Sequence, residues 1–215
     1  MTLRTITAIL LAAFALTVRS ADEPSDDLGA VMREAPVIAE DATAPEMLEK
    51  CRAMVPEKVA IEGRIILRNR RGIVQAEHAY ALEREGGRTT LVIDGEKVEA
   101  GSGSIAGTDV TWSDLSLDYL WWSDVSFDAE KESETVHGQV CTVVLLKNGE
   151  RTVRIWIDRR TGAMMQAEEL EAGRVMRRMW GTRIKKFGER WAPNVLEVET
   201  VGSGHRTKIT VEKLK

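Results

Sequence analysis

Hydrophobic and polar positions alternate along most of the chain after Pro56, with the period of two that is typical of half-buried β-strands. Short turn sequences such as Asp94-Gly95, Asn148-Gly149 and Ala172-Gly173 separate the alternating segments. Connections this short join antiparallel neighbours, because a parallel crossover needs about a dozen residues or more. The pattern predicts strands over 59–67, 73–82, 89–93, 136–146, 153–157, 164–170, 175–184, 191–201 and 207–211.

Two segments depart from this period, and we expect both to contain a short helix. Segment 44–54 has a proline suited to a first helical turn, and its apolar residues recur at helical spacing. Segment 101–124 breaks into a Gly/Ser loop followed by a Trp-rich run. There, Thr111 precedes Asp114 by three residues, which resembles an N-cap with an acid in the first turn and predicts a helix around 112–120.

An antiparallel sheet of this many strands is expected to curl, because twist accumulates and open edges invite aggregation. Segment 140–146 is apolar on both faces, so that one face can line a barrel while the other meets a helix. The sequence therefore predicts a mainly β fold, an incomplete antiparallel β-barrel with short helices covering its open side.

The N-terminal segment of the sequence predicts that the protein is exported from the cytoplasm. Arg4 precedes an apolar run over 6–18, and Val18-Arg19-Ser20 resembles a signal-peptidase site. We expect a signal peptide over 1–20, cleaved between Ser20 and Ala21, a flexible acidic leader over 21–43 and one domain over 44–215. The expected location is the periplasm.

Composition narrows the function classes. The formal net charge is −4 and no basic tract is present, so we expect no nucleic-acid partner. Cys51 and Cys141 are the two cysteines, and disulfides persist outside the cytoplasm. Docking of the first helix on the 140–146 strand would bring them together, which predicts a disulfide; two separately buried thiols are the alternative.

Motifs for catalysis or cofactor binding are weak. Segment 101–106 matches G-x-G-x-x-A, but its neighbours are short strands rather than a βαβ unit. His78, His137 and His205 lack the spacing of a metal site, and no nucleophile signature accompanies the cysteines. We expect no cofactor, no metal and no enzymatic activity.

A basic strand over 174–186 allows two interpretations. An arginine at the mouth of an apolar cavity could bind a lipid phosphate or a partner carboxylate. Alternatively, these side chains pair across the sheet with acidic neighbours, which are Glu168, Glu169, Glu171, Glu197 and Glu199.

Large apolar side chains could either pack the core or line a lipid-sized cavity under a helical lid. Half of the six Trp residues lie in the Trp-rich run, and methionines add adaptability. The candidate cavity and lid residues are Trp112, Leu115, Trp121, Trp122, Val143, Ile155, Met165 and Trp180.

Several short sequence motifs follow one another in a fixed order between Ala44 and Val211. They are Met54-Val55-Pro56, Glu62-Gly63-Arg64, the 108–115 segment, Gly138-Gln139-Val140-Cys141, the 157–162 segment and Trp191-Ala192-Pro193. In these motifs and their order the chain resembles the outer-membrane lipoprotein-sorting protein family, the LolA-like periplasmic carriers, and more closely a divergent branch of stand-alone secreted proteins.

The resemblance implies an incomplete antiparallel barrel whose apolar cavity shields acyl chains of lipoproteins or other lipids between membranes. It also implies an inner-membrane transporter as donor and an outer-membrane acceptor. We expect a monomeric carrier. The alternative is a non-catalytic accessory module of an envelope export complex, with a barrel packed by its own side chains.

Overall fold

A computed structural model of the 215-residue chain describes residues 38, 41–101, 103–188 and 190–215. The predicted signal peptide lies outside the described residues, as does most of the predicted leader. Among the described residues, no helix has the length and hydrophobicity to cross a membrane.

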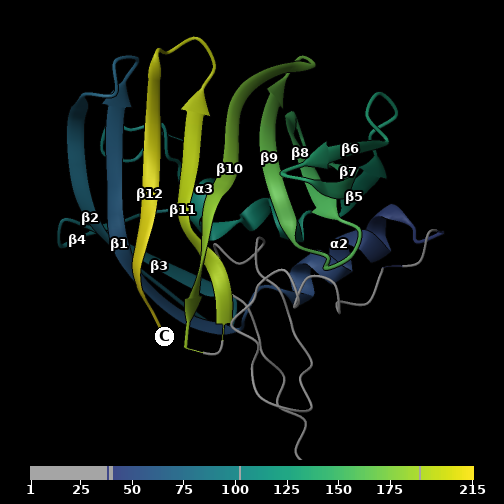
Figure 1. The fold of residues 1–215 in the computed structure, drawn as a ribbon, viewed down its shortest axis with the longest axis horizontal. Coiled ribbons are helices and arrows are strands. Elements are labelled where there is room, and N and C mark those ends of the chain that lie inside the picture. The colour runs from purple at the N-terminus through teal and green to yellow at the C-terminus, as the bar shows by residue number, and fades with distance from the viewer. Residues whose placement is uncertain (1–37, 39–40, 102, 189) are drawn as a thin grey trace, which may run out of the picture.

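One open antiparallel sheet of twelve strands forms the body of the molecule (Figure 1). Its strands run in the order β4-β3-β2-β1-β12-β11-β10-β9-β8-β7-β5, and β6 also pairs with β7. The curled, unclosed sheet confirms the predicted fold class. The strands are β1 (Lys58–Asn69), β2 (Val74–Glu85), β3 (Arg88–Ile93), β4 (Glu96–Val98), β5 (Asp124–Phe127), β6 (Ser133–Val136), β7 (Gln139–Asn148), β8 (Arg151–Asp158), β9 (Met164–Glu171), β10 (Arg174–Phe187), β11 (Arg190–Thr200) and β12 (His205–Leu214).

Tight turns fix the register of the meander. Asp94 and Gly95 have φ of 51° and 88°, and Ala172 and Gly173 have φ of 49° and 77°. Two successive residues with positive φ match the right-handed twist of the flanking strands. Two predictions needed correction: the strand expected over 136–146 is a hairpin that turns at His137-Gly138, and β4 and β5 had not been predicted.

Helix α2 (Ala44–Ala53) confirms the first predicted helix. It begins with a capping box, in which the Thr43 N–H donates to Glu46 Oε2 at 2.7 Å. Its buried side chains include Met47, Leu48 and Cys51, and the helix packs against β5, β8 and the 3₁₀ helix η2 (Asp118–Trp121).

The core lies between the concave face of the sheet and the helices α2, α3 (Trp112–Ser116) and η2. Successive strand residues point to opposite faces. The concave row includes Val144, Ile155, Ala167, Met179 and Val198, all buried and all cross-strand neighbours.

The convex face carries ion pairs in place of an apolar row. Arg154 is buried there between Asp128 at 2.5 Å and Glu168 at 3.3 Å. Arg178 extends the row by pairing with Glu168 at 3.0 Å. Because the buried carboxylates Asp128 and Glu168 both have cationic partners, this part of the sheet accommodates their charge.

Candidate functional site

The Trp-rich insertion between β4 and β5 lies on the concave face of the sheet, as Figure 1 shows for α3 behind β10 and β11. It is not one helix but two short ones, because Leu117 adopts the left-handed conformation with φ of 53° between α3 and η2. The predicted association of Thr111 with Asp114 is present, with the Thr111 N–H donating to Asp114 Oδ2 at 2.6 Å. We call residues 109–122 the insertion.

Apolar side chains of the insertion fill the concave side. Leu115, Leu117 and Leu120 are at most 2% exposed, and Trp122 is 7% exposed. Tyr119 is buried with its hydroxyl 3.7 Å from the Met164 sulfur. The insertion therefore covers the concave face of the sheet with its own apolar side chains.

Four arginines from four different elements hold the insertion, and we call them the arginine clamp. Arg52 of α2 donates to the Leu120 and Trp122 carbonyls, the latter at 3.0 Å. Arg151 of β8 donates to the Ser113 hydroxyl at 3.0 Å and lies over the Trp122 ring. The other two members are Arg84 and Arg177.

Arg177 of β10 makes the most contacts in the clamp. It pairs with Asp114, donates to the Asp109 carbonyl at 2.5 Å and pairs with Glu169 at 3.1 Å. Burial opposes its charge, but Asp114 and Glu169 more than offset this effect and raise the pKa of Arg177. This guanidinium therefore ties the insertion to the sheet through charged hydrogen bonds.

Arg84 of β2 makes the weakest contacts. Its Nη2 donates to the Ser116 carbonyl at 3.4 Å, and its guanidinium lies 4.4 Å from the centre of the Trp121 ring. Trp121 itself is 48% exposed. A half-exposed indole thus covers a buried cation.

The predicted cavity and lid residues do not form one site. Leu115 and Trp122 belong to the insertion, and Ile155 lies beneath it on the concave face. Val143 pairs with Trp156 and is buried on the convex side, because it neighbours Val144 along the strand. Trp180 also lies on the convex side, under Arg206 at 5.2 Å. Met165 is the extra residue of a bulge between β8 and β9.

Trp112 borders a separate cavity of about 630 Å³ beside β3, β4 and the Gly/Ser loop. Its wall also contains His78, whose Nδ1 lies 2.7 Å from Asp94 Oδ2. The pKa of Asp94 is lowered, first by this hydrogen bond and then by the Ala79 N–H. The wall of this cavity combines charged side chains, apolar side chains and the backbone of the Gly/Ser loop.

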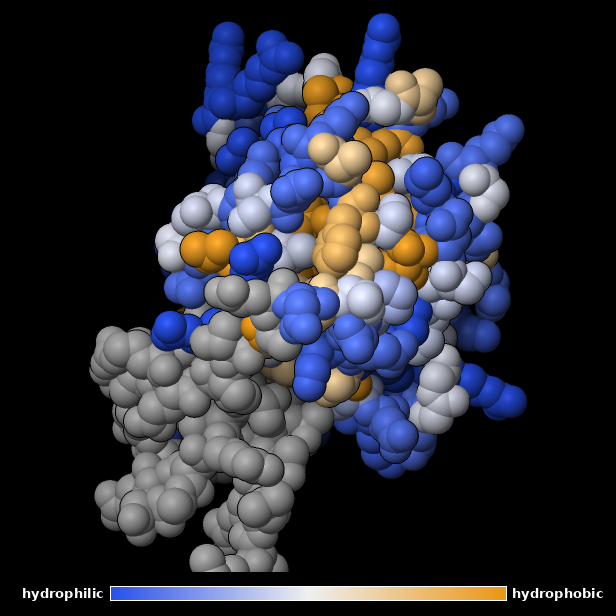
Figure 2. Space-filling view, turned by 90° about the vertical axis from the view of Figure 1, so that its right-hand side faces the viewer, coloured by the Kyte–Doolittle hydropathy of each residue, from blue (hydrophilic) through white to orange (hydrophobic). Residues whose placement is uncertain are grey.

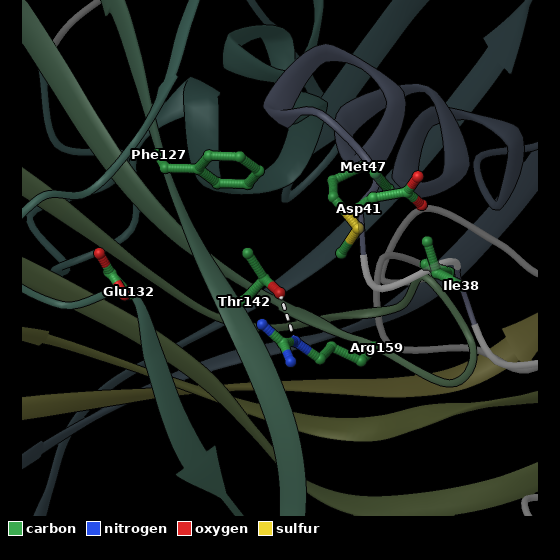
Figure 3. A pocket seen from close by; sticks show the side chains of 8 residues that line it. Ile38, Asp41, Met47, Phe127, Glu132, Thr142 and Arg159 are labelled. Carbon is green, nitrogen blue, oxygen red and sulfur yellow. Dashed lines mark hydrogen bonds between the residues drawn. The ribbon is translucent and has the colours of Figure 1, made fainter.

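A second cavity, of about 320 Å³, lies between α2 and the end of the sheet formed by β5 and β7 (Figure 3). Met47 and Phe127 face it from α2 and β5, while Arg159 donates to the Thr142 hydroxyl at 2.8 Å on its polar side. Figure 2 shows this end of the molecule, with a hydrophobic band between hydrophilic side chains. Phe127 and Val140 are the large exposed apolar residues of β5 and β7.

Cys51 and Cys141 are buried free thiols in the structure, which does not contain the predicted disulfide. The alternative interpretation from the sequence, two separately buried thiols, describes their state. The described residues contain no group of three or more His, Cys, Asp or Glu side chains placed to hold a metal ion.

The basic strand follows the second of its two interpretations. Arg177 and Arg178 pair with Glu169 and Glu168, as expected for cross-strand neighbours. The clamp contacts of Arg177 with the insertion were not predicted. Neither were those of Arg52, Arg84 and Arg151, because no local pattern marks an arginine whose partner is distant in sequence.

Comparison with solved structures identifies this architecture as the LolA-like fold. A LolA superfamily protein from Nitrosomonas europaea aligns over 81% of this chain and 93% of its own, with 14% identity and a TM-score of 0.65. An outer membrane lipoprotein-sorting protein domain from Vibrio parahaemolyticus aligns over 80% and 92%, with 13% identity and a TM-score of 0.60. A DUF1329 family protein from Desulfovibrio piger aligns over 79% and 89%, with 14% identity and a TM-score of 0.58.

Sequence comparison places the chain more narrowly. Residues 91–215 match the model of a family described as "Uncharacterized protein", and the chain belongs to that family. No curated protein matches the chain.

Proposed function

We propose that this protein is a non-catalytic periplasmic carrier that shields acyl chains of lipoproteins or other lipids during transfer between envelope membranes. The observation that carries the proposal is the insertion. It places apolar side chains on the concave face of an open sheet, yet the clamp holds it largely through hydrogen bonds and ion pairs at its margins. Such an element can leave the sheet and expose an apolar surface.

The energetics favour reversible binding. Burying an acyl chain gains about 0.8 kcal/mol for each CH₂ group. Displacement of Leu115, Leu117 and Leu120 from the concave face would subtract from this gain, because these side chains are buried before the ligand arrives. A carrier needs this balance, since it must release its cargo as well as extract it.

The fold supports the proposed class of function but not a particular cargo. The Vibrio parahaemolyticus domain is named for lipoprotein sorting, and the Nitrosomonas europaea protein for the LolA superfamily. We propose that this chain has a similar activity and is located in the periplasm. We also propose that it takes its cargo from an inner-membrane donor and delivers it to an outer-membrane acceptor.

A second candidate is a packed interaction module of an envelope export complex. It is favoured by the burial of the concave face, where Val144 and Ile155 are fully covered by the protein's own side chains. In that case the insertion is permanent core and the exposed edge near Phe127 meets the partner.

A titration with dansyl-undecanoic acid distinguishes the two candidates. The carrier is expected to give saturable fluorescence with micromolar affinity, and Ile155→Glu, beneath the insertion, is expected to weaken it. Val143→Glu is not a suitable control because Val143 is buried on the convex side; Val140→Glu, at an exposed position, is the matched control. Absence of saturable binding, together with lipid-free protein from the periplasm by mass spectrometry, would favour the module.

A further inference from the structure

Arg84 differs from the other three clamp arginines because, within the described part of the chain, it has no carboxylate partner. Each of the other three has a carboxylate oxygen within 4.0 Å. Among the described residues, none lies that close to the Arg84 guanidinium. An unpaired cation inside a protein is costly, and such groups are uncommon unless they have a role in binding or chemistry.

The hydrogen bonds of Arg84 are also incomplete. The residue is 7% exposed, and the one side-chain hydrogen bond that it makes to described residues is the 3.4 Å contact of Nη2 with the Ser116 carbonyl. Nε and Nη1 are buried without a partner in the described residues. Burial lowers the pKa of Arg84. Two of the three guanidinium nitrogens therefore keep N–H donors that could bind an acceptor, one on each side of Nη2.

Trp121 is the cover of this group. Its ring lies 4.4 Å from the guanidinium carbon, and the residue is 48% exposed at the end of η2. A half-exposed side chain at a helix end can change rotamer at little cost in packing. Its movement would give the two free donors access to an incoming group.

The position of Arg84 in the sheet indicates what that group is attached to. Arg84 lies beside Val59 in the register and shares the concave face with Leu82, and both neighbours are buried. The cation thus stands at one end of an apolar surface. This arrangement suits a ligand with an apolar chain and a terminal anion, because the guanidinium fork matches carboxylate and phosphate oxygens.

We propose that Arg84 is the binding site for the anionic group, a carboxylate or a phosphate, of the acyl-chain ligand, and that Trp121 turns aside to admit it. This proposal rests on the proposed carrier function and adds the chemical class of the cargo: acyl chains that carry a negative charge.

The test compares dansyl-undecanoic acid with its methyl ester, which differ in charge and share the same chain and fluorophore. Wild-type protein is expected to bind the acid more tightly. Arg84→Met is expected to weaken acid binding by about tenfold to a hundredfold more than ester binding, because only the acid loses a charge-assisted hydrogen bond. The ester reports any change that the variant causes through the clamp. Arg206→Met is the matched control, because Arg206 also lies over a Trp ring, but on the convex face.

Two further measurements keep the proposal testable if Arg84→Met does not fold. Arg84→Lys keeps the charge and loses the fork, and is expected to retain part of the preference for the acid. Trp121→Ala uncovers Arg84 and is expected to speed association of the acid relative to the ester.

Three outcomes would overturn the proposal. Equal effects of Arg84 variants on acid and ester would leave the carrier function standing and reduce Arg84 to a clamp residue. Displacement of dansyl-undecanoic acid by acetate or by inorganic phosphate, neither of which has an acyl chain, would indicate that Arg84 binds free anions. Failure of both probes to bind wild-type protein would refute the proposed function along with the anionic cargo.

Discussion

Arg177 and Arg178 are adjacent in β10 and stabilise different parts of the molecule. Arg177 points to the concave face and meets Asp114 of the insertion, whereas Arg178 points to the convex face and meets Glu168. The alternation of side chains along a strand is the physical cause of this division. A single basic strand can therefore hold the insertion on one side and complete an ion-pair row on the other.

The reactivity of the two cysteines can be tested directly. Burial raises the pKa of Cys51 to about 12, and burial together with Asp158 raises the pKa of Cys141 to about 12. Since the thiolate is the reactive form, iodoacetamide at mildly alkaline pH is expected to label native protein slowly. Unfolded, unreduced protein is expected to yield two labelled thiols per chain.

Mass spectrometry gives the labelling count, and Cys141→Ser is the control that should leave one labelled thiol. No label on unfolded, unreduced wild-type protein would mean that the disulfide forms after all.

At the scale of elements, the insertion is expected to open more readily than the sheet. Arg177→Met would leave Asp114, which is 8% exposed, without its cationic partner on the sheet. Removing one member of a buried pair costs about 3 to 5 kcal/mol, so amide exchange over 111–122 should rise at least about tenfold.

Hydrogen exchange read by mass spectrometry checks this prediction. Arg178→Met is the matched control, because it removes the neighbouring cation from the convex face and should leave the insertion protected. Equal protection of 111–122 in both variants would show that packing of the leucines, rather than the clamp, holds the insertion.

An element could be predicted from the sequence when the residues that determine it are close together in the chain. Alternating residues and turn dipeptides report on neighbours in the chain, so α2 and most strands of the meander could be predicted. Strand β5 could not, because its four residues are largely exposed and too few to establish an alternating pattern. The Trp-rich run identified the insertion, but Arg84 and Ser116 are separated by 32 residues and no local pattern connects them.

For the molecule as a whole, the decisive contact joins the first strand to the last. β1 lies between β2 and β12, so the N-terminal hairpins become part of the sheet when the C-terminal strand arrives. Pairing across this sequence distance forms late and carries a large loop-closure cost. The concave face, and with it any cavity beneath the insertion, depends on this junction.

Gly63 is the residue that makes the junction possible. It lies at an irregularity between β1 and β12, where a Cβ would be 1.8 Å from the Thr210 carbonyl oxygen and 2.9 Å from the Tyr80 ring. Gly63→Ala must therefore separate the strands or displace the ring. We expect the free energy of unfolding to fall by about 3 kcal/mol, at the upper end of overpacking costs.

Urea unfolding measures this loss, and Gly101→Ala is the matched control, because nothing lies within 4 Å of the Cβ it would add. The control is expected to change stability by less than about 0.5 kcal/mol. If Gly63→Ala proved equally neutral, β1 and β12 would have to be farther apart at this position than the structure has them. If it instead lowered stability and weakened acyl-probe binding together, the junction would be established as the support of the concave face.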